Sequence, residues 1–397
     1  MTEATGGLSA LRVLDASTVI AAPLVSSLLA DFGADVIKVE HPGSGDPARV
    51  FEPTKDERSL SFKVTNRNKR SVTVDFHQES GVELFYRLVR EVDIVVVNFR
   101  PDKLAEWKID YADLVKHNPR LIMLHISAFG RTGPYANKPG FARIAESFAG
   151  LTHITGYPDR PPVFTGYPLA DGITGYYGAF ATMVAVEHRN RTGEGQLIDL
   201  ALYEPVLRLM EDFVVGHGAT GWVKQRSGNA QAHVVPNDVY PTADGEFVIL
   251  PVSTNSMWLR LVKLLDDPEL TQYESNAARL ANRELIDGKV RAFTEKYPLA
   301  DLLEVCAEAG LAASKINNVT DIVADPQINH RGNLTTVYDP ELGTDLLMQA
   351  PVPTFSTISG EVRHPGPRLG EHTDEVLRDT AGLTDTEISA LRERGTI

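Results

Sequence analysis

Several features that often assign a protein to a class are scarce in this chain or missing from it. A single cysteine, Cys306, excludes an internal disulfide and a cysteine metal cluster. No apolar run approaches the length of a membrane span, and the polar, acidic residues 2–7 do not resemble a signal peptide. The formal net charge of −14 argues against a nucleic-acid partner or an anionic membrane. We therefore expect a soluble, cytoplasmic protein, and 397 residues are enough for two domains.

Common catalytic motifs are missing too. The chain has no phosphate loop ending in Gly-Lys-Ser/Thr and no Gly-x-Ser-x-Gly. None of its eleven histidines falls in a His-Glu-x-x-His or another metal-binding spacing, so no metal site is expected. Cys306 lies in a helical pattern, which favours a buried small hydrophobe over a nucleophile.

Alternating strand and helix patterns fill the first 130 residues. Runs of Val and Ile predict strands at 12–15, 35–40, 71–75, 93–98 and 120–126, with helices at 22–33, at 80–91 and before Arg120. This order predicts an α/β fold with a doubly wound, Rossmann-like parallel sheet. Ligands of such sheets bind beyond the carboxyl ends of the strands, so the loops after Asp15, Glu40, Asp75 and Asn98 are candidates.

The pattern changes in the second half of the chain. We expect a helix at 172–191, a strand at 195–200, a helix at 203–214, a polar crossing segment at 218–236, a hairpin at 238–250 with an Asp-Gly turn, and three helical stretches up to Ala313. A C-terminal helix at 384–394 has capping-box spacing at its start. The predicted division is a large domain at 1–225, a smaller α/β domain at 226–327 and a return segment at 328–397 that completes the large domain.

Asp171 is the first candidate for catalysis. It lies between Ala170 and Gly172, with no lysine or arginine within eight residues. This environment suits a carboxylate that meets a ligand better than one that forms a salt bridge. The local alternative is an N-cap of the helix that follows, and the neighbouring residues alone favour it. The rest of the chain favours catalysis.

A basic cluster suggests an anionic ligand. Its members, within eight residues, are Lys63, Arg67, Lys69 and Arg70, and they could hold phosphates. A solvated loop is the alternative, and it is favoured when the cluster is taken alone. Asn98 and Arg100 add an amide and a guanidinium at a predicted sheet edge. Together the two loops favour a phosphate-bearing ligand.

Ordered blocks of sequence resemble the class III coenzyme A transferases. This family includes formyl-CoA, carnitine and benzylsuccinate CoA-transferases together with the α-methylacyl-CoA racemases. The blocks follow the family order at 11–15, 29–40, 43–47, 66–71, 97–101, 130–135, 169–171 and 191–196.

The resemblance implies a set of site residues and partners. It places the catalytic aspartate on Asp171 and the CoA contacts on Ile20, Ala21, His41, Val74, Asp75, Phe76, His77, Asn98, Phe99, Arg100 and Lys138. It also implies an interlocked homodimer, with acyl-CoA and a carboxylic acid as substrates and no tightly bound cofactor. His41 and Glu106 stand where some relatives have arginine, so phosphate binding would depend on Lys69, Arg70, Arg100 or Lys108.

The chemistry that the resemblance implies needs few groups. A carboxylate with a reference pKa of about 3.9 is ionised at neutral pH and can attack a thioester without a general base. A mixed anhydride, an aspartyl-CoA thioester and a second anhydride would follow. Gly172 is expected to supply an amide donor for the tetrahedral oxyanions.

Alternatives remain for the reaction and the substrates. A racemase needs acid-base groups on both sides of the α-carbon, but Phe141 and Ala142 occupy the positions of the racemase His-Asp pair. A CoA-binding protein without catalysis is the third possibility. Residues 139–146 and 202–208 resemble members that use succinyl-CoA with malate, citramalate or mesaconate. Arg143 could pair with a distal carboxylate or with a nearby Glu.

Overall fold

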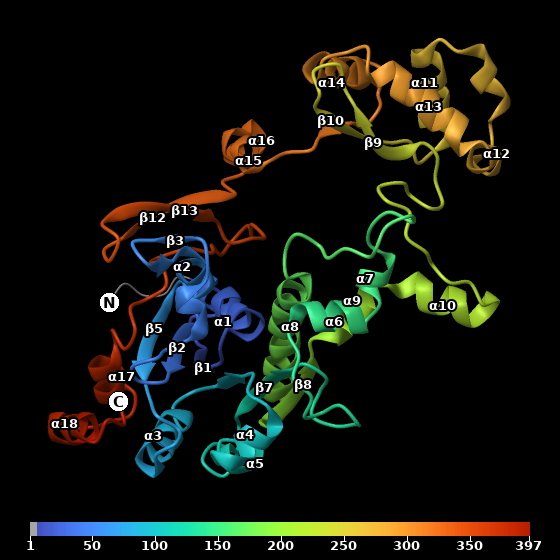
Figure 1. The fold of residues 1–397 in the computed structure, drawn as a ribbon. Helices are drawn as coiled ribbons and strands as arrows, with labels where there is room; N and C mark the ends of the chain where they lie inside the picture. The colour runs from blue at the N-terminus through green and yellow to red at the C-terminus, as the bar shows by residue number, and fades with distance from the viewer. Residues whose placement is uncertain (1–5) are drawn as a thin grey trace. The chain divides into compact units, whose positions relative to one another are not determined.

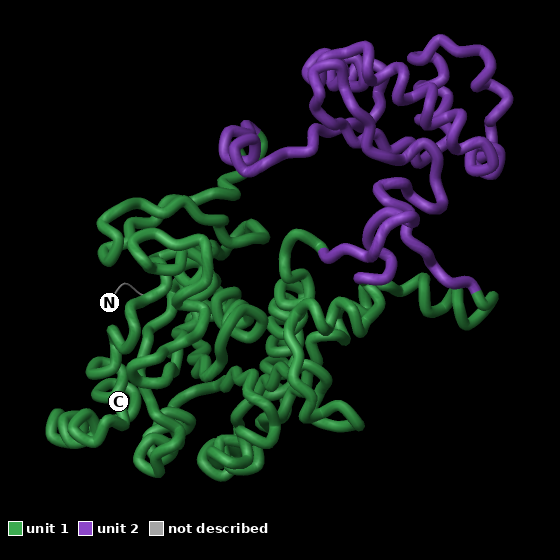
Figure 2. Tube along the Cα trace, in the orientation of Figure 1, with its two compact units in different colours: residues 1–151, 165–221, 327–397 green, residues 152–164, 222–326 purple. Residues whose placement is uncertain are grey.

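The computed structural model describes residues 6–397, so residues 2–5 of the polar start lie outside the described part. Contacts divide the chain into two compact units (Figure 2). Unit 1 contains residues 1–151, 165–221 and 327–397, and unit 2 contains residues 152–164 and 222–326. The domain boundaries that the sequence suggests, after residues 225 and 327, stay predictions. Among the described residues, no helix has both the length and the hydropathy of a membrane span.

Unit 1 is built on a six-stranded parallel sheet (Figure 1). The strands are β1 (Arg12–Ala16), β2 (Asp35–Glu40), β5 (Lys69–Thr73), β6 (Ile94–Val97), β7 (Ile122–Ser127) and β8 (Gln196–Ala201), in the order β5-β2-β1-β6-β7-β8. Every neighbouring pair is parallel. The predicted α/β fold with a doubly wound sheet is confirmed. Because the strand order reverses at β1, the loops after β1 and β6 flank the switch point where such sheets bind ligands.

Helices cover both faces of this sheet, because alternate strand residues point to opposite sides. Leu14 and Val95 pack on one face with α3 (Glu79–Val89), α17 (Thr373–Asp379) and α18 (Asp385–Glu393). Val13 and Ile94 pack on the other with α1 (Ala21–Asp31), α6 (Ala142–Phe148), α8 (Leu169–Thr192) and α9 (Tyr203–Leu209). The burial of strands on both sides explains their continuous Val and Ile runs.

Shorter elements complete unit 1. They are η1 (Pro47–Val50), β3 (Thr54–Lys55), β4 (Arg58–Ser59), α2 (Leu60–Thr65), α4 (Pro101–Glu106), α5 (Tyr111–Leu114), α10 (Glu211–Thr220), β12 (Leu334–Asp339) and β13 (Thr344–Gln349). The expected helix at 203–214 is wrong as one piece, because the backbone of Met210 leaves the helical region and separates α9 from α10. A Gly-x-Gly-x-x-Gly spacing at 216–221 lies at the end of α10, not between a strand and a helix, so it is no dinucleotide fingerprint.

Unit 2 has its own sheet and core. Strands β9 (Asn237–Pro241), β10 (Phe247–Pro251) and β11 (Ser314–Lys315) form an antiparallel sheet, with helices α11 (Asn255–Leu265), α12 (Asn276–Ala281), α13 (Arg283–Thr294), α14 (Leu299–Glu308) and α15 (Val319–Ala324) and the 3-10 turn η2 (Pro268–Gln272). Two short helices, α7 (Leu151–Ile154) and α16 (Pro326–His330), lie at the unit boundaries. The hairpin is confirmed, and Cys306 is buried as expected. Four helices, not three, precede Ala313, because Asn282 ends α12 and starts α13.

The C-terminal prediction is confirmed in detail. Thr384 caps α18, its hydroxyl accepts from the Glu387 amide, and the Glu387 carboxylate accepts from the Thr384 amide. These reciprocal bonds satisfy amides that a helix start leaves without partners.

Candidate active site

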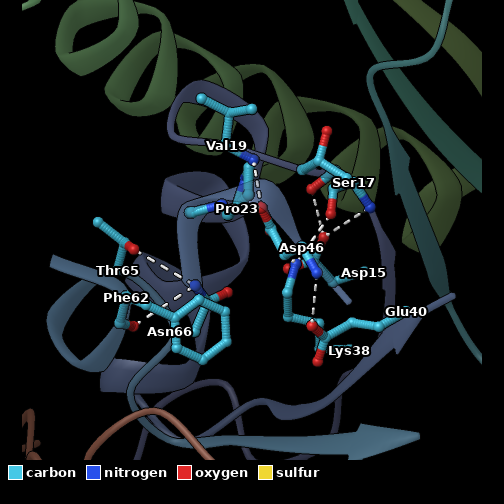
Figure 3. A network of polar contacts seen from close by, with 12 residues as sticks. Asp15, Ser17, Val19, Pro23, Lys38, Glu40, Asp46, Phe62, Thr65 and Asn66 are labelled. Carbon is cyan, nitrogen blue, oxygen red and sulfur yellow. Dashed lines mark hydrogen bonds and ion pairs between the residues drawn. The ribbon is translucent and has the colours of Figure 1, made fainter. Parts of the chain in front are cut away.

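A buried charge network of Asp15, Lys38, Asp46 and Lys69 underlies the loop after β1. Figure 3 shows Asp15, Lys38 and Asp46 beneath this loop. The Lys69 ammonium lies 2.7 Å from Asp15 Oδ2, and Lys38 Nζ lies 2.9 Å from Asp46 Oδ2. Burial opposes ionisation of Asp15, yet the two lysines lower the pKa of its carboxyl group. Burial lowers the pKa of Lys69 to about 8. A set of two lysines and two aspartates is thus held without solvent, which requires close pairing.

Two members of the basic cluster, Lys69 and Lys63, are paired with buried carboxylates. Lys69 is fully buried and donates to Asp15, so it cannot reach a ligand. Lys63 pairs with Asp339 at 2.9 Å and with Glu341 at 2.7 Å. The phosphate role expected of Lys69 is therefore wrong, and a solvated loop is wrong as well for this part of the chain. Both fail because the cations neutralise buried carboxylates.

The other two members of the cluster also have acidic partners. Arg67 Nε donates to Asp31 at 2.9 Å, and Arg70 binds both carboxylate oxygens of Asp35 and also pairs with Glu375 at 2.9 Å. The phosphate role expected of Arg70 is not supported, since its guanidinium already binds two acidic side chains. Arg100 and Lys108 remain exposed at the surface.

The loop after β1 is held in an unusual conformation by this network. Val19 has a φ of +73°, a left-handed conformation that a β-branched residue rarely adopts. Its amide donates to Asp46 Oδ1 at 3.0 Å, while Lys38 donates to the Ser17 carbonyl at 2.8 Å. The Asn98 side chain fixes Thr18 from β6, with bonds of 2.9 and 2.7 Å to its amide and carbonyl. Two strands at the switch point thus fix the loop that leads into α1.

Asp171 lies in a small pocket at this switch point. The pocket has a volume of about 120 Å³, and its lining comprises Thr18, Val19, Ile20, Ala21, Asn98, Ile126, Ser127, Ala128, Gly140, Phe141, Asp171 and Leu202. The fold therefore brings Asp171 together with three of the expected CoA contacts, Ile20, Ala21 and Asn98.

The Asp171 carboxyl group is buried without a partner. It is 9% exposed and makes no hydrogen bond to any residue in the described range 6–397. Asp171 is the third residue of α8 and Pro168 is the N-cap, so the N-cap interpretation is wrong. Burial, followed by the charge of Glu146, raises the pKa of Asp171 to about 7. This raised pKa opposes the full ionisation at neutral pH that the sequence predicts.

A second expectation about this helix is also corrected. The Gly172 amide donates to the Pro168 carbonyl at 3.2 Å, so it is not free to bind an oxyanion. Ala21 begins α1, where the first amides of a helix have no acceptor within it. Ala21 lines the Asp171 pocket, so its amide is better placed for the role than that of Gly172.

Asp75 and His77, two of the expected CoA contacts after β5, lie close to His41, which follows β2. His77 Nδ1 lies 2.9 Å from Asp75 Oδ1, and His41 Nε2 lies 3.7 Å from the same oxygen. Their three ligand atoms fall within 4.8 Å of one another, a donor set that could hold a cation such as Zn²⁺.

The remaining expected contacts are spread along the rim. Val74 is buried, and the Phe76 and Phe99 rings both pack against Trp107. Arg100 is exposed and lies 3.5 Å from Asp102. Lys138 is exposed, with its ammonium 3.8 Å from the Tyr135 ring centre. Arg100 and Lys138 do not line the Asp171 pocket.

Sequence reasoning missed the part played by Glu146. This residue is 1% exposed, and its Oε1 accepts from the Ala170 amide at 3.2 Å. The sequence holds a weak signal for this residue. Glu146 follows Ala142 by four residues, so a helix places this acid on the same face as an apolar residue, where a charged side chain is unexpected.

Comparisons with known proteins identify the family of this chain. The sequence profile of CoA-transferase family III matches residues 8–373. The chain belongs to CoA-transferase family III. The family resemblance is thereby confirmed, and with it the assignment to an enzyme class.

Among relatives in this family, the succinyl-CoA–L-malate CoA-transferase beta subunit of Chloroflexus aurantiacus is 39% identical over 402 residues, covering 100% of this chain and 99% of its own. The succinyl-CoA–D-citramalate CoA-transferase of the same organism is 38% identical over 394 residues, covering 98% of each. A crystal structure of a CaiB/BaiF family protein from Brucella suis has a TM-score of 0.85 and 34% identity, covering 95% of this chain and 100% of its own.

Proposed function

We propose that this family III enzyme transfers CoA from succinyl-CoA to a dicarboxylic acid of four or five carbons. Relatives that match almost the whole chain are named for succinyl-CoA and for malate, citramalate, glutarate or mesaconate. Arg143 of α6 is a candidate partner for the distal carboxylate of the acid. A screen in which only monocarboxylic acids accept CoA would contradict this acceptor class.

The observation that carries the mechanism is the buried, unpartnered carboxyl group of Asp171. In its ionised form it attacks the thioester carbonyl, which forms a mixed anhydride and releases CoA thiolate. The thiolate then attacks the aspartyl carbonyl, which expels the donor acid and leaves an aspartyl-CoA thioester. The acceptor acid attacks this thioester, and CoA thiolate opens the second anhydride at the acceptor carbonyl to regenerate Asp171. The amide of Ala21, the first residue of α1 and part of the pocket lining, is the proposed donor to each oxyanion.

Racemisation is less compatible with the pocket. It requires a second proton carrier opposite Asp171, and Phe141, which lines the pocket, has no group that exchanges protons. Glu146 is an acid, but it does not line the pocket and binds the Ala170 amide.

The CoA nucleotide is proposed to lie along the carboxyl edge of β2, β5 and β6. His41, residues 74–77, residues 98–100 and Lys138 are the proposed contacts there, in addition to Ile20 and Ala21. Arg100, Lys108 and Lys138 are the exposed cations available to phosphate groups, since Lys63 and Lys69 pair with buried carboxylates.

An interlocked homodimer is proposed as the assembly. Tyr176, Phe180 and Val184 lie four residues apart on α8 and are 58%, 66% and 54% exposed, so they form an apolar stripe. A stripe of this kind on a long helix suits burial against a second copy of the chain.

Charge placed on this stripe should weaken the dimer. We expect Phe180→Asp to lower the share of dimer recovered after refolding from urea, measured by light scattering coupled to gel filtration, while Arg191→Glu, at the polar end of the same helix, leaves that share unchanged. A Phe180→Asp protein that refolds to dimer as completely as the wild type would contradict this interface.

Mass spectrometry tests the covalent step. After mixing with succinyl-CoA and peptic digestion, the peptide containing Asp171 should carry a CoA adduct, and hydroxylamine should remove it. A racemase would instead incorporate solvent deuterium at the α-carbon of a branched acyl-CoA, and a protein that only binds CoA would give neither signal.

A further inference from the structure

Glu146 is an acidic side chain buried without a cation. It lies on α6 and is 1% exposed, and no lysine, arginine or histidine of the described residues forms an ion pair with it. The hydrogen-bond donor to its carboxylate is the Ala170 amide, which lies 3.2 Å from Oε1. Buried carboxylates normally have a charged partner, so a single amide is a sparse environment for one.

The amide that Glu146 binds belongs to the first turn of α8. That helix begins after Pro168, whose side chain cannot accept a hydrogen bond, so the first amides of α8 lack the usual cap. Glu146 supplies the missing acceptor from a neighbouring helix. Ala170 is adjacent to Asp171, so the same bond fixes the turn from which the nucleophile projects.

The charge of Glu146 also acts on Asp171. Burial is the first cause of the raised pKa of Asp171, and repulsion from Glu146 is the second. The other titratable groups on the elements packed against α8 are Asp31, His125, Arg143, Asp199, Tyr203, Glu204 and Arg208. Asp171's own segment adds Tyr167, Tyr176 and Tyr177, with Glu187, His188, Arg189 and Arg191 in the last turns of α8. Asp31 and Asp199 bind Arg67 and the Arg131 amide respectively, and Glu204 binds the Ala201 amide.

We propose that Glu146 is a positioning residue, which anchors the first turn of α8 and holds a negative charge beside Asp171, and so sets the pH range in which Asp171 acts as the nucleophile. The inference rests on the proposed function, because it assigns a task within the aspartyl mechanism.

The proposal has a chemical consequence for the mixed anhydride. A more basic carboxylate is a better nucleophile and a poorer leaving group. When the CoA sulfur attacks the aspartyl carbonyl, a C–S bond forms, the C–O bond to the donor acyl group breaks and the donor acid leaves. When it attacks the donor carbonyl instead, Asp171 leaves and the donor thioester is restored. Raising the basicity of Asp171 therefore favours the first course at the donor anhydride, and by the same rule it slows the release of Asp171 when CoA thiolate opens the acceptor anhydride.

The test compares the pH dependence of kcat/KM for the wild type and Glu146→Gln. The wild-type rate should rise with pH through about 7 and then level off, because only ionised Asp171 attacks. Glutamine keeps an acceptor for the Ala170 amide but carries no charge. We expect the acid limb of the Glu146→Gln profile, the part where kcat/KM rises with pH, to move down by about one pH unit. Near pH 5.5, kcat/KM as a fraction of its high-pH plateau should then be about ten-fold higher in Glu146→Gln than in the wild type. Glu146→Ala should shift the limb in the same direction and also lower the plateau, since it removes the anchor.

A matched control is Glu204→Gln. Glu204 also accepts a backbone amide at the start of a helix, from Ala201 at 2.8 Å, but it is exposed. This variant should keep the wild-type acid limb. Isotope-edited infrared spectra of the free proteins, with labelled aspartate, should show the same downward shift of one carboxyl titration in Glu146→Gln, and that titration should vanish in Asp171→Asn.

Two outcomes separate the inference from the proposed function. If the wild type forms the Asp171 adduct but Glu146→Gln keeps the wild-type acid limb, the inference is overturned and the function stands. If the wild type forms no adduct and Asp171→Ala transfers CoA at the wild-type rate, the proposed function itself is overturned.

Discussion

Asp171→Ala is expected to lose CoA transfer by several orders of magnitude while it folds and assembles as the wild type does. The carboxyl group makes no hydrogen bond to a described residue, so its removal leaves no partner unsatisfied. No other carboxylate lines the pocket, so none can take its place as nucleophile. The measurement is the initial rate of CoA exchange between succinyl-CoA and labelled succinate, with circular dichroism and light scattering as controls for fold and assembly. A rate within ten-fold of the wild type would contradict the aspartyl mechanism.

Ionisation of Asp171 should lower the free energy of unfolding, and this loss of stability should grow as the pH rises. The pKa of Asp171 is raised from 3.8 to about 7 in the folded protein, so the folded state binds the proton more tightly than the unfolded state. Ionisation therefore destabilises the fold; the effect is absent below pH 4 and is fully developed above pH 7. At about 1.4 kcal/mol per pKa unit, it amounts to at most about 4 kcal/mol. Asp171→Asn should thus be more stable than the wild type at pH 8 and equally stable at pH 4, as measured by urea unfolding. A variant that is less stable at pH 8 would show that the carboxylate has a partner.

Asp46→Ala is expected to have the largest destabilising effect. It removes the acceptor for the Val19 amide and leaves the buried Lys38 ammonium without its 2.9 Å partner. Loss of one partner from a buried ion pair typically lowers the free energy of unfolding by about 3–5 kcal/mol. The left-handed conformation of Val19 would also lose the bond that offsets its strain.

Asp46→Asn is the matched variant. It keeps an oxygen for the Val19 amide but removes the negative charge, and Asp15 still faces Lys38. We expect a smaller loss of stability than in Asp46→Ala, measured by urea unfolding at pH 7. Equal stability of Asp46→Ala and the wild type would show that the network does not hold the loop.

Local patterns predicted the sheet because its strands are buried on both faces. The segment 35–40 was predicted as a strand from Val and Ile alone and coincides with β2. The six parallel strands follow from the strict alternation with helices, which allows few other arrangements. The switch point, and with it the approximate place of the site, then follows from the topology.

Properties that depend on distant residues could not be predicted in this way. Lys63 pairs with Asp339 and Glu341, which follow it by more than 270 residues, so no local pattern could show that this lysine is buried. The pKa of Asp171 depends on burial and on Glu146, which lies on another helix. The engaged amide of Gly172 depends on α8 starting at Leu169, a few residues before the predicted start.

The single thiol of the chain is a natural probe of local opening in unit 2. Cys306 is enclosed among Trp258, Leu302 and their neighbours, so an alkylating reagent reaches sulfur only when that core opens. No second cysteine competes for the reagent. The rate of labelling therefore reports how often this part of the enzyme loosens, with or without CoA present, and no engineered probe is needed.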